Sequence, residues 1–144
     1  MAPEPIPEGF HTVTPYLVVQ GVDKLIDFLK KAFGAKERFR HQRPDGTTGH
    51  AEVTIGDSIV MMGEAGDPSK AMPATMYLYV NHVDETYKQA IRAGAKSMME
   101  PTDMFYGDRS GGVIDPFGIH WWIATHTEDV SPDELARRAK AQGK

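Results

Sequence analysis

Residues 14–23, TPYLVVQGVD, recur at residues 75–84 as TMYLYVNHVD, with Thr, Tyr, Leu, two Val and Asp matching at a constant offset. After a deletion of one residue, Gly-Ala-Lys at residues 34–36 matches Gly-Ala-Lys at residues 94–96. Chance rarely produces two matches in one register. An internal repeat of this length indicates that one supersecondary unit is used twice.

Each copy begins with the alternation of a half-buried strand and continues with the pattern of an amphipathic helix. Asp23 and Asp84 are the predicted N-caps of the two helices, and Gly34 and Gly94 stand where a glycine would end them. Short strands separated by turn residues follow each helix. In the first copy we expect them over residues 36–42, 50–55 and 58–63, and in the second over residues 96–100, 112–114 and 119–125. The β-α-β-β-β unit, used twice, predicts an α+β fold.

The expected organisation has four segments. Residues 1–11 are rich in Pro and Glu and predict a flexible arm. Residues 12–66 form the first module and residues 67–130 the second, together one domain. Ser131 and Glu134 form a capping box that begins a short C-terminal helix within residues 131–144.

The composition excludes several classes of protein. The chain of 144 residues has 16 Lys and Arg against 20 Asp and Glu, a net charge of −4, and no cysteine. Disulfides, thiolate metal sites and a cysteine nucleophile are therefore excluded, and the missing basic clusters argue against nucleic acid as a partner. No apolar run approaches the ~20 residues of a membrane helix. We expect a cytoplasmic protein without a membrane partner.

The strand period of two sorts the side chains into two faces. One face is apolar and suits a helix, whereas the other gathers Tyr, His, Glu, Met and Trp. So many aromatic side chains would form a large exposed patch, so we expect a concave sheet that encloses a ligand pocket.

Two motifs point to a family: GDSIVMMGE at residues 56–64 and DPFGIHWWI at residues 115–123. With the tandem β-α-β-β-β repeat, they resemble the vicinal oxygen chelate superfamily of glyoxalases, extradiol dioxygenases and bleomycin-resistance proteins. FYGDRSGGV at residues 105–113 is similar to its PhnB-like branch. The resemblance implies curved mixed sheets that combine into a half-open barrel, helices on the outer face and a homodimer.

The resemblance also implies where a metal would be held. Metal-dependent members place a His, Gln or Glu ligand on each opening and each closing strand. Here those positions fall on Thr14, Met62 (or Met61 if the register slips by one), Thr75 and Trp122. None is an ordinary ligand for a hard or borderline divalent ion, so we expect no metal cofactor.

Two functions remain open. The first is a metal-free protein that binds a small aromatic or anionic molecule through Tyr16, Met62, Tyr77, Tyr79, Tyr106, Arg109 and Trp122. The second is a glyoxalase-type lyase or isomerase with His50, Glu52 and His120 as catalytic residues, acting by acid/base chemistry or holding Zn, Ni, Fe or Mn on shifted ligands. Each choice has a structural alternative: His50 and Glu52 as a cross-strand pair, Arg109 as the partner of Asp108 or Asp115, and the aromatic residues as a buried cluster.

Overall fold

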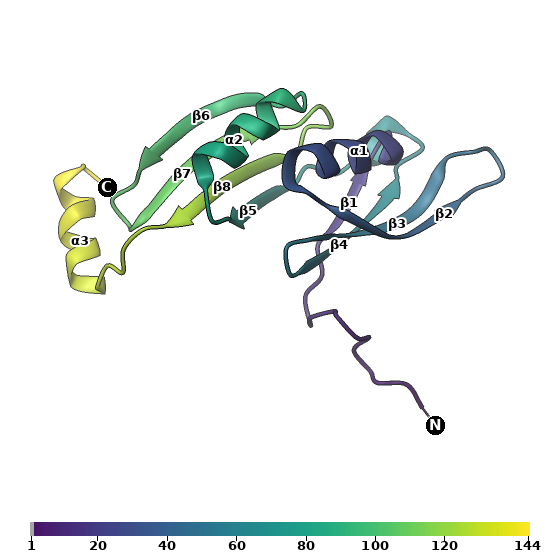
Figure 1. The fold of residues 1–144 in the computed structure, drawn as a ribbon, viewed down its shortest axis with the longest axis horizontal. Coiled ribbons are helices and arrows are strands. Elements are labelled where there is room, and N and C mark those ends of the chain that lie inside the picture. The colour runs from purple at the N-terminus through teal and green to yellow at the C-terminus, as the bar shows by residue number, and fades with distance from the viewer. Residues whose placement is uncertain (1) are drawn as a thin grey trace. The chain divides into compact units, whose positions relative to one another are not determined.

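A computed structural model describes residues 2–144, which divide into two compact units, one ending at Ala74 and the other formed by Thr75–Lys144 (Figure 1). The first unit contains β1 (Tyr16–Val19), α1 (Val22–Phe33), β2 (Lys36–Gln42), β3 (Thr48–Ile55), β4 (Ser58–Glu64) and the short 3-10 helix η1 (Pro68–Lys70). The second contains β5 (Thr75–Tyr79), α2 (Val83–Arg92), β6 (Lys96–Asp103), β7 (Asp108–Ile114), β8 (His120–His126) and α3 (Pro132–Ala141).

The two units have the same topology. The strand order is β1-β4-β3-β2 in the first sheet and β5-β8-β7-β6 in the second. In both, the opening strand runs parallel to the closing strand and the other pairs are antiparallel. Each sheet is therefore open, mixed and four-stranded rather than a closed barrel. The predicted α+β fold of two β-α-β-β-β modules is confirmed.

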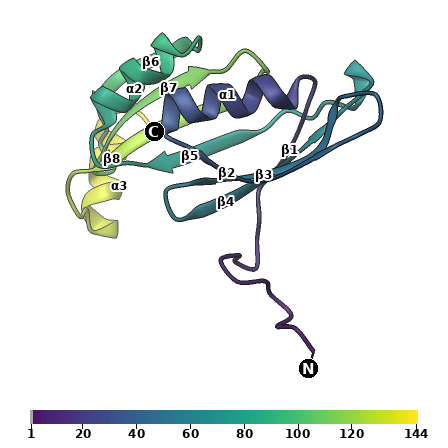
Figure 2. The same cartoon turned by 45° about the vertical axis from the view of Figure 1, so that its right-hand side comes forward.

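Helices α1 and α2 each lie across one face of the sheet in their own unit (Figures 1 and 2). In the first unit, Leu17 and Met62 are register partners on the covered face and are buried, as are Leu25, Ile26 and Leu29 of α1. Full burial of each such side chain contributes roughly 1.5–3 kcal/mol to folding. These residues form the core of the unit.

The core of the second unit is built around Trp121. It is 1% exposed, as its place on the helix-covered face requires. Its indole Nε1 donates to Oδ2 of Asp115 at 2.8 Å, and Oδ1 of the same carboxylate accepts from the backbone N–H groups of Phe117 and Ile119. The Asp-Pro-Phe-Gly turn thereby fixes the start of β8.

The helix N-termini correct the predicted N-caps. α1 begins after Gly21 and α2 after His82, and neither cap residue makes a side-chain capping bond. The closing strands serve this role instead. The Glu64 carboxylate accepts from the backbone N–H of Gly21 at 3.0 Å and of Val22 at 3.1 Å, and the Thr125 hydroxyl accepts from that of Val83 at 3.0 Å.

The predicted cap residues Asp23 and Asp84 lie inside the first turns of α1 and α2, and each binds an arginine of the sheet. Asp23 pairs with Arg40 at 2.9 Å and Asp84 with Arg109 at 2.9 Å. Both were predicted as caps because an Asp before an apolar stripe is the usual signature of a helix start. In the structure, side chains of β4 and β8 that are distant in sequence accept the hydrogen bonds from the helix N-terminal N–H groups in place of these aspartates.

The predicted C-terminal helix is present as α3. Ser131 is its N-cap and accepts from the backbone N–H of Glu134 at 3.2 Å. Arg138 donates to the carbonyl oxygen of Phe105 at 3.2 Å, so α3 packs on the turn between β6 and β7 of its own unit. Within residues 2–144, no helix is long and apolar enough to cross a membrane.

Candidate functional site

The face of each sheet turned away from its helix carries the aromatic residues. We call these the first aromatic face, with Tyr16, Phe39, His50, Glu52 and Met61, and the second aromatic face, with Tyr77, Tyr79, Asp108, Gly112 and Trp122. Each is described within its own unit.

On the first aromatic face, Tyr16, His50 and Glu52 form a chain of hydrogen bonds. The Tyr16 hydroxyl lies 3.2 Å from His50 Nδ1, and His50 Nε2 lies 3.2 Å from Oε2 of Glu52. An ionised carboxylate only accepts, so Nε2 carries a hydrogen, and Nδ1 of a neutral imidazole then accepts from Tyr16. The chain ends at the Tyr16 side chain, which is half exposed, and can orient its hydroxyl or relay a proton.

Arg38 joins this chain to the N-terminal arm. Its Nε lies 3.8 Å from Oε1 of Glu52, and its guanidinium lies 5.5 Å from the centre of the Phe10 ring. The carboxylate pairs with the charge of the guanidinium, and the Phe10 ring stacks against it, at the edge of the first aromatic face. His50 and Glu52 are paired, but as residues two apart on β3 and not across two strands as predicted, whereas His120 lies at the start of β8 in the other unit.

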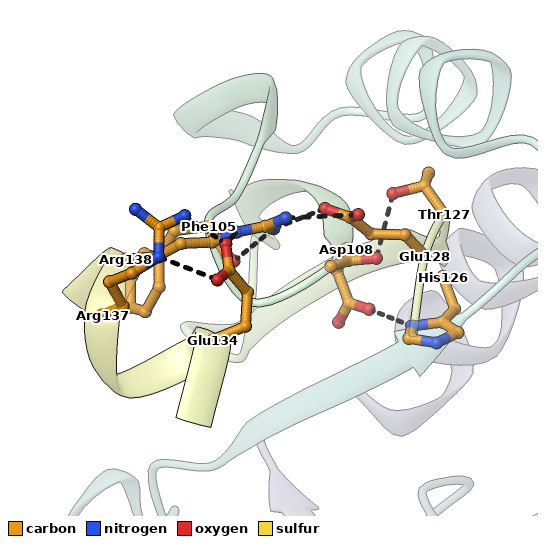
Figure 3. A network of polar contacts seen from close by, with 9 residues as sticks. Phe105, Asp108, His126, Thr127, Glu128, Glu134, Arg137 and Arg138 are labelled. Carbon is orange, nitrogen blue, oxygen red and sulfur yellow. Dashed lines mark hydrogen bonds and ion pairs between the residues drawn. The ribbon is translucent and has the colours of Figure 1, made fainter. Parts of the chain in front are cut away.

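On the second aromatic face, one buried carboxylate holds two tyrosines and a histidine. Oδ2 of Asp108 accepts from the hydroxyl of Tyr77 at 2.7 Å and from that of Tyr79 at 3.0 Å. Oδ1 lies 2.8 Å from Nδ1 of His126, and Nε2 of His126 lies 2.8 Å from Oδ1 of Asp129. The contact between Asp108 and His126 is drawn in Figure 3. The tyrosines reach Asp108 across β8, where the register partner of Tyr79 is the small Ala124 and that of Tyr77 is Trp122.

The pKa shifts follow from this geometry. Burial acts to raise the pKa of Asp108, but the hydrogen bonds from His126, Tyr77 and Tyr79 outweigh it and hold the pKa below its usual range. Burial and the bond to Asp108 raise the pKa of Tyr77, and the bond to Asp108 also raises that of Tyr79. The hydrogen bonds to Asp108 and Asp129 raise the pKa of His126. Asp108 is therefore a carboxylate and both tyrosines are neutral phenols near neutral pH.

Trp122 extends the aromatic surface beside Tyr77, its register partner on β5. Its other register partner, on β7, is Gly112. A Cβ atom at Gly112 would lie 2.5 Å from a ring carbon of Trp122, closer than van der Waals contact permits. The glycine thus makes room for the indole against the sheet.

Two predicted ligand-binding residues lie on the opposite, helix-covered faces. Met62 is fully buried and pairs with Leu17, so it belongs to the core, and Met61 takes the place on the aromatic face. The repeat agrees, because Tyr16 pairs with Met61 as Tyr77 pairs with Trp122. The alternative register that included Met61 is the one found.

Arg109 is the second such residue. It binds Asp84 of α2 at 2.9 Å and Asp103 of β6 at 3.2 Å, and neither Asp108 nor Asp115 is its partner in these ion pairs. Because adjacent strand residues point to opposite faces, Asp108 lies on the aromatic face and Arg109 on the helix side. Arg109 holds α2 to the sheet and is not placed to clamp a ligand beside Trp122.

Asp108 and His126 are residues of the second aromatic face that the sequence did not reveal. Asp108 was considered only as a partner of Arg109, and the closing strand was expected to end before His126. Period-two counting back from Gly112 would have put Asp108 on the aromatic face. Tyr106, a predicted ligand-binding residue, lies in the turn before β7, and its proximity also raises the pKa of Tyr77.

The residues at the superfamily's metal positions do not fit a divalent ion. Thr14, Met61, Thr75 and Trp122 supply no imidazole or carboxylate. Within residues 2–144, no group of three or more His, Cys, Asp and Glu side chains is arranged to hold a metal ion.

A separate groove of about 610 Å³ lies on the helix side of the second unit, between α2 and β6. It is lined by Tyr87, Lys88, Ile91, Arg92, Ala95, Lys96, Ser97 and Glu100. The predicted site residues are not among these, so the groove is distinct from both aromatic faces.

Comparisons with known proteins cover most of the chain. The Glyoxalase/Bleomycin resistance protein/Dioxygenase superfamily model matches residues 9–123. An uncharacterized protein of Mycobacterium bovis is 35% identical over 142 residues, which cover 91% of this chain and 93% of that protein. An uncharacterized protein of Mycobacterium tuberculosis is also 35% identical, over 91% of this chain and 84% of its own length.

Solved structures share the fold. TioX from Micromonospora sp. ML1 is similar with a TM-score of 0.68 and 27% identity, over 81% of this chain and 98% of that one. A glyoxalase/bleomycin resistance protein/dioxygenase from Nocardioides has a TM-score of 0.63 and 19% identity, over 85% of this chain and 87% of that one. The second likeness is one of fold alone.

Proposed function

Because this chain belongs to the glyoxalase/bleomycin resistance protein/dioxygenase superfamily, we propose that it binds a small planar aromatic molecule on its second aromatic face, without the superfamily's usual metal centre. Members of one superfamily differ in reaction and ligand, so the proposal rests on the site rather than on the fold. The observation that carries it is the row formed by Tyr77, Tyr79 and Trp122.

This row leaves much aromatic surface in contact with solvent. Tyr77 is 43% and Tyr79 65% exposed, and their ring centres lie 5.3 Å apart. Contiguous exposed aromatic surface marks binding sites in soluble proteins, and rings whose hydroxyls are already fixed lose little freedom when a ligand stacks on them. The row thus has the chemistry of a stacking platform.

Of the two kinds of ligand that the sequence predicted, aromatic and anionic, the structure favours the aromatic one. An anion was expected to bind Arg109, which is engaged by Asp84 and Asp103 on the helix side. A ligand on the second aromatic face meets phenols and an indole instead. The proposal therefore keeps the aromatic ligand.

Thermal stabilisation tests the proposal. A ligand that binds only the folded chain raises its stability by RT ln(1 + [L]/Kd), so a planar aromatic compound at about 100 times its Kd should add roughly 2.7 kcal/mol. Trp122→Ala should remove this stabilisation. Phe117→Ala, which removes a ring in the turn between β7 and β8, should retain it. An unchanged ligand effect in Trp122→Ala would place the binding site elsewhere.

A second candidate function is metal-free acid/base catalysis of the glyoxalase type. The chain from Tyr16 through His50 to Glu52 favours it, because a binding surface does not need such a relay. Its test is turnover of adducts between an α-keto aldehyde and a thiol. Turnover that survives a chelator and is lost in His50→Asn would support the enzyme, and turnover lost to the chelator would support a metal on shifted ligands.

Three finer expectations stay predictions. They are membership of the PhnB-like branch, assembly into a homodimer and a cytoplasmic location. The dimer is tested together with the metal content below.

A further inference from the structure

We propose that the second aromatic face selects planar ligands that carry positive charge or N–H donors, and discriminates against anions of the same size. This inference rests on the proposed function and names its ligand class. It is carried by the arrangement of Tyr77 and Tyr79 around Asp108.

Both tyrosine hydroxyl hydrogens are directed at Asp108. A phenol has one O–H donor, and an ionised carboxylate only accepts. The hydroxyls of Tyr77 and Tyr79 lie 2.7 Å and 3.0 Å from the same oxygen, Oδ2, so each donates its single hydrogen there. What the two phenol oxygens can still offer a ligand is their lone pairs, which accept hydrogen bonds. Those of Tyr79 are the more open, because the hydroxyls of Tyr106 and Ser110 lie beside the Tyr77 oxygen.

Asp108 is locked in this role. It is 3% exposed, and its other oxygen is bound by His126, which is bound in turn by Asp129. A phenol could turn its hydrogen toward a ligand only by leaving a buried carboxylate without that bond, which costs more than the loss of an ordinary hydrogen bond. The donor direction is therefore part of the fold and is not adjusted to each ligand.

The surrounding charges favour the same class of ligand. Asp108 and Asp129 lie on either side of His126, so this cluster keeps a net negative charge even when His126 is protonated. A phenol that donates to a carboxylate is also a stronger acceptor at its own oxygen. The two nearby arginines are engaged with other carboxylates, Arg109 on the helix side and Arg138 with Glu128 and Glu134. The electron-rich tyrosine and tryptophan rings also attract a cation.

The test compares three planar three-ring probes on the full chain by fluorescence titration at neutral pH. The probes are proflavine, a cation with amino donors, neutral acridine, and the anion acridine-9-carboxylate. We expect proflavine to bind about tenfold or more tightly than the carboxylate, with acridine between them, since hydrogen bonds to charged groups contribute this much. Equal affinities, or tightest binding of the anion, would overturn the inference.

Variants separate the hydroxyls from the rings. Tyr77→Phe and Tyr79→Phe keep the stacking surface and remove one acceptor each, so the preference for proflavine over acridine should shrink while acridine still binds. Tyr87→Phe is the matched control, because its hydroxyl bonds Ser97 on the other side of the sheet, and it should change neither affinity. A full preference in the double variant Tyr77→Phe/Tyr79→Phe would also refute the role of the phenol oxygens.

The two proposals fail in different ways. If the probes bind with no preference for the cation and Trp122→Ala abolishes binding, the aromatic site stands and the selectivity is wrong. If none of the three probes binds, both are wrong.

Discussion

His126 links two carboxylates at the edge of the second aromatic face. Its imidazole lies 2.8 Å from Asp108 on one side and 2.8 Å from Asp129 on the other, so its protonated form is the one that both contacts stabilise. Asp108 in turn directs the hydroxyls of Tyr77 and Tyr79. A change at this half-exposed histidine is thereby transmitted to the buried carboxylate.

The raised pKa of His126 predicts a pH-dependent contribution to stability. Folding raises this pKa above its ordinary value of 6.5, so the folded chain holds the proton more tightly than the unfolded chain. The stabilisation is complete below 6.5 and is lost as the pH rises through the raised value. His126→Gln should therefore lower Tm more below pH 6.5 than well above it, as measured by calorimetry.

The control for this prediction is His11→Gln, which removes a histidine in the exposed N-terminal arm. It should show no such pH-dependent difference in Tm. A difference between the parent chain and His126→Gln that grows with rising pH would contradict the assignment, because it would require folding to lower the pKa of His126. Asp108 acts in the other direction: its lowered pKa stabilises the fold above its ordinary value of 3.8, and this is lost as the pH falls.

Among the elements, α1 and α2 are anchored from the sheet. Glu64 and Thr125 stand at the same position of the repeat, at the end of the closing strand, and each satisfies backbone N–H groups at a helix N-terminus. One is a carboxylate and the other a hydroxyl, so similarity between the copies does not reveal the shared role. By contrast, the N-cap Ser131 of α3 could be predicted from the sequence, because its hydroxyl accepts from a backbone N–H only three residues away.

Helix α3 packs on the turn between β6 and β7, which leads into the second aromatic face. Arg138 binds the carbonyl oxygen of Phe105 at 3.2 Å and the Glu128 carboxylate at 2.5 Å (Figure 3). Arg137 and Arg138 together hold the pKa of Glu134 at about 2. The Phe105 turn leads directly through Tyr106 and Gly107 into Asp108, so α3 supports the start of β7.

Arg138→Ala should loosen this turn. We expect faster amide hydrogen exchange in residues 104–107 and in α3, measured by mass spectrometry, because Arg138 of α3 donates a hydrogen bond to the Phe105 carbonyl oxygen of the turn. Arg137→Ala is a matched control on the same helix, since Arg137 is 72% exposed and its ion pair is with Glu134 of its own helix. Equal exchange in the two variants would show that α3 docks without Arg138.

At the scale of the molecule, the two units repeat one topology but carry different sites. The first aromatic face has a Tyr-His-Glu chain and the second a Tyr-Asp-Tyr cluster with a histidine. Related positions thus hold different chemistry, and Met61 and Trp122 are the clearest pair. The same topology therefore presents two different sets of polar and aromatic side chains.

Native mass spectrometry with elemental analysis of the purified chain tests the molecular predictions together. We expect a homodimer, as the resemblance to the superfamily implies. We expect no stoichiometric metal, because Thr14, Met61, Thr75 and Trp122 are poor ligands. One equivalent of Zn, Ni, Fe or Mn per chain would contradict this and favour an enzyme that uses His50, Glu52 or His120. A monomer would contradict the dimer while leaving the metal prediction intact.

The modules, the helix positions and the division of each sheet into an apolar and an aromatic face followed from the sequence alone. They follow because the periods of 2 and 3.6 residues are local properties that can be read directly along the chain. The same periods placed Tyr16, Tyr77, Tyr79 and Trp122 on their faces. Met62 was misplaced because a shift of one residue in strand register reverses every side chain.

The partners of the charged and polar residues were decided by the tertiary structure. Asp108 meets two tyrosines 29 and 31 residues away, and Glu64 meets a helix start 42 and 43 residues away. Such contacts depend on strand order and on the register between strands, and neither is encoded in a local pattern. For that reason the aromatic surface was predicted, whereas the carboxylate that orients it emerged only from the fold.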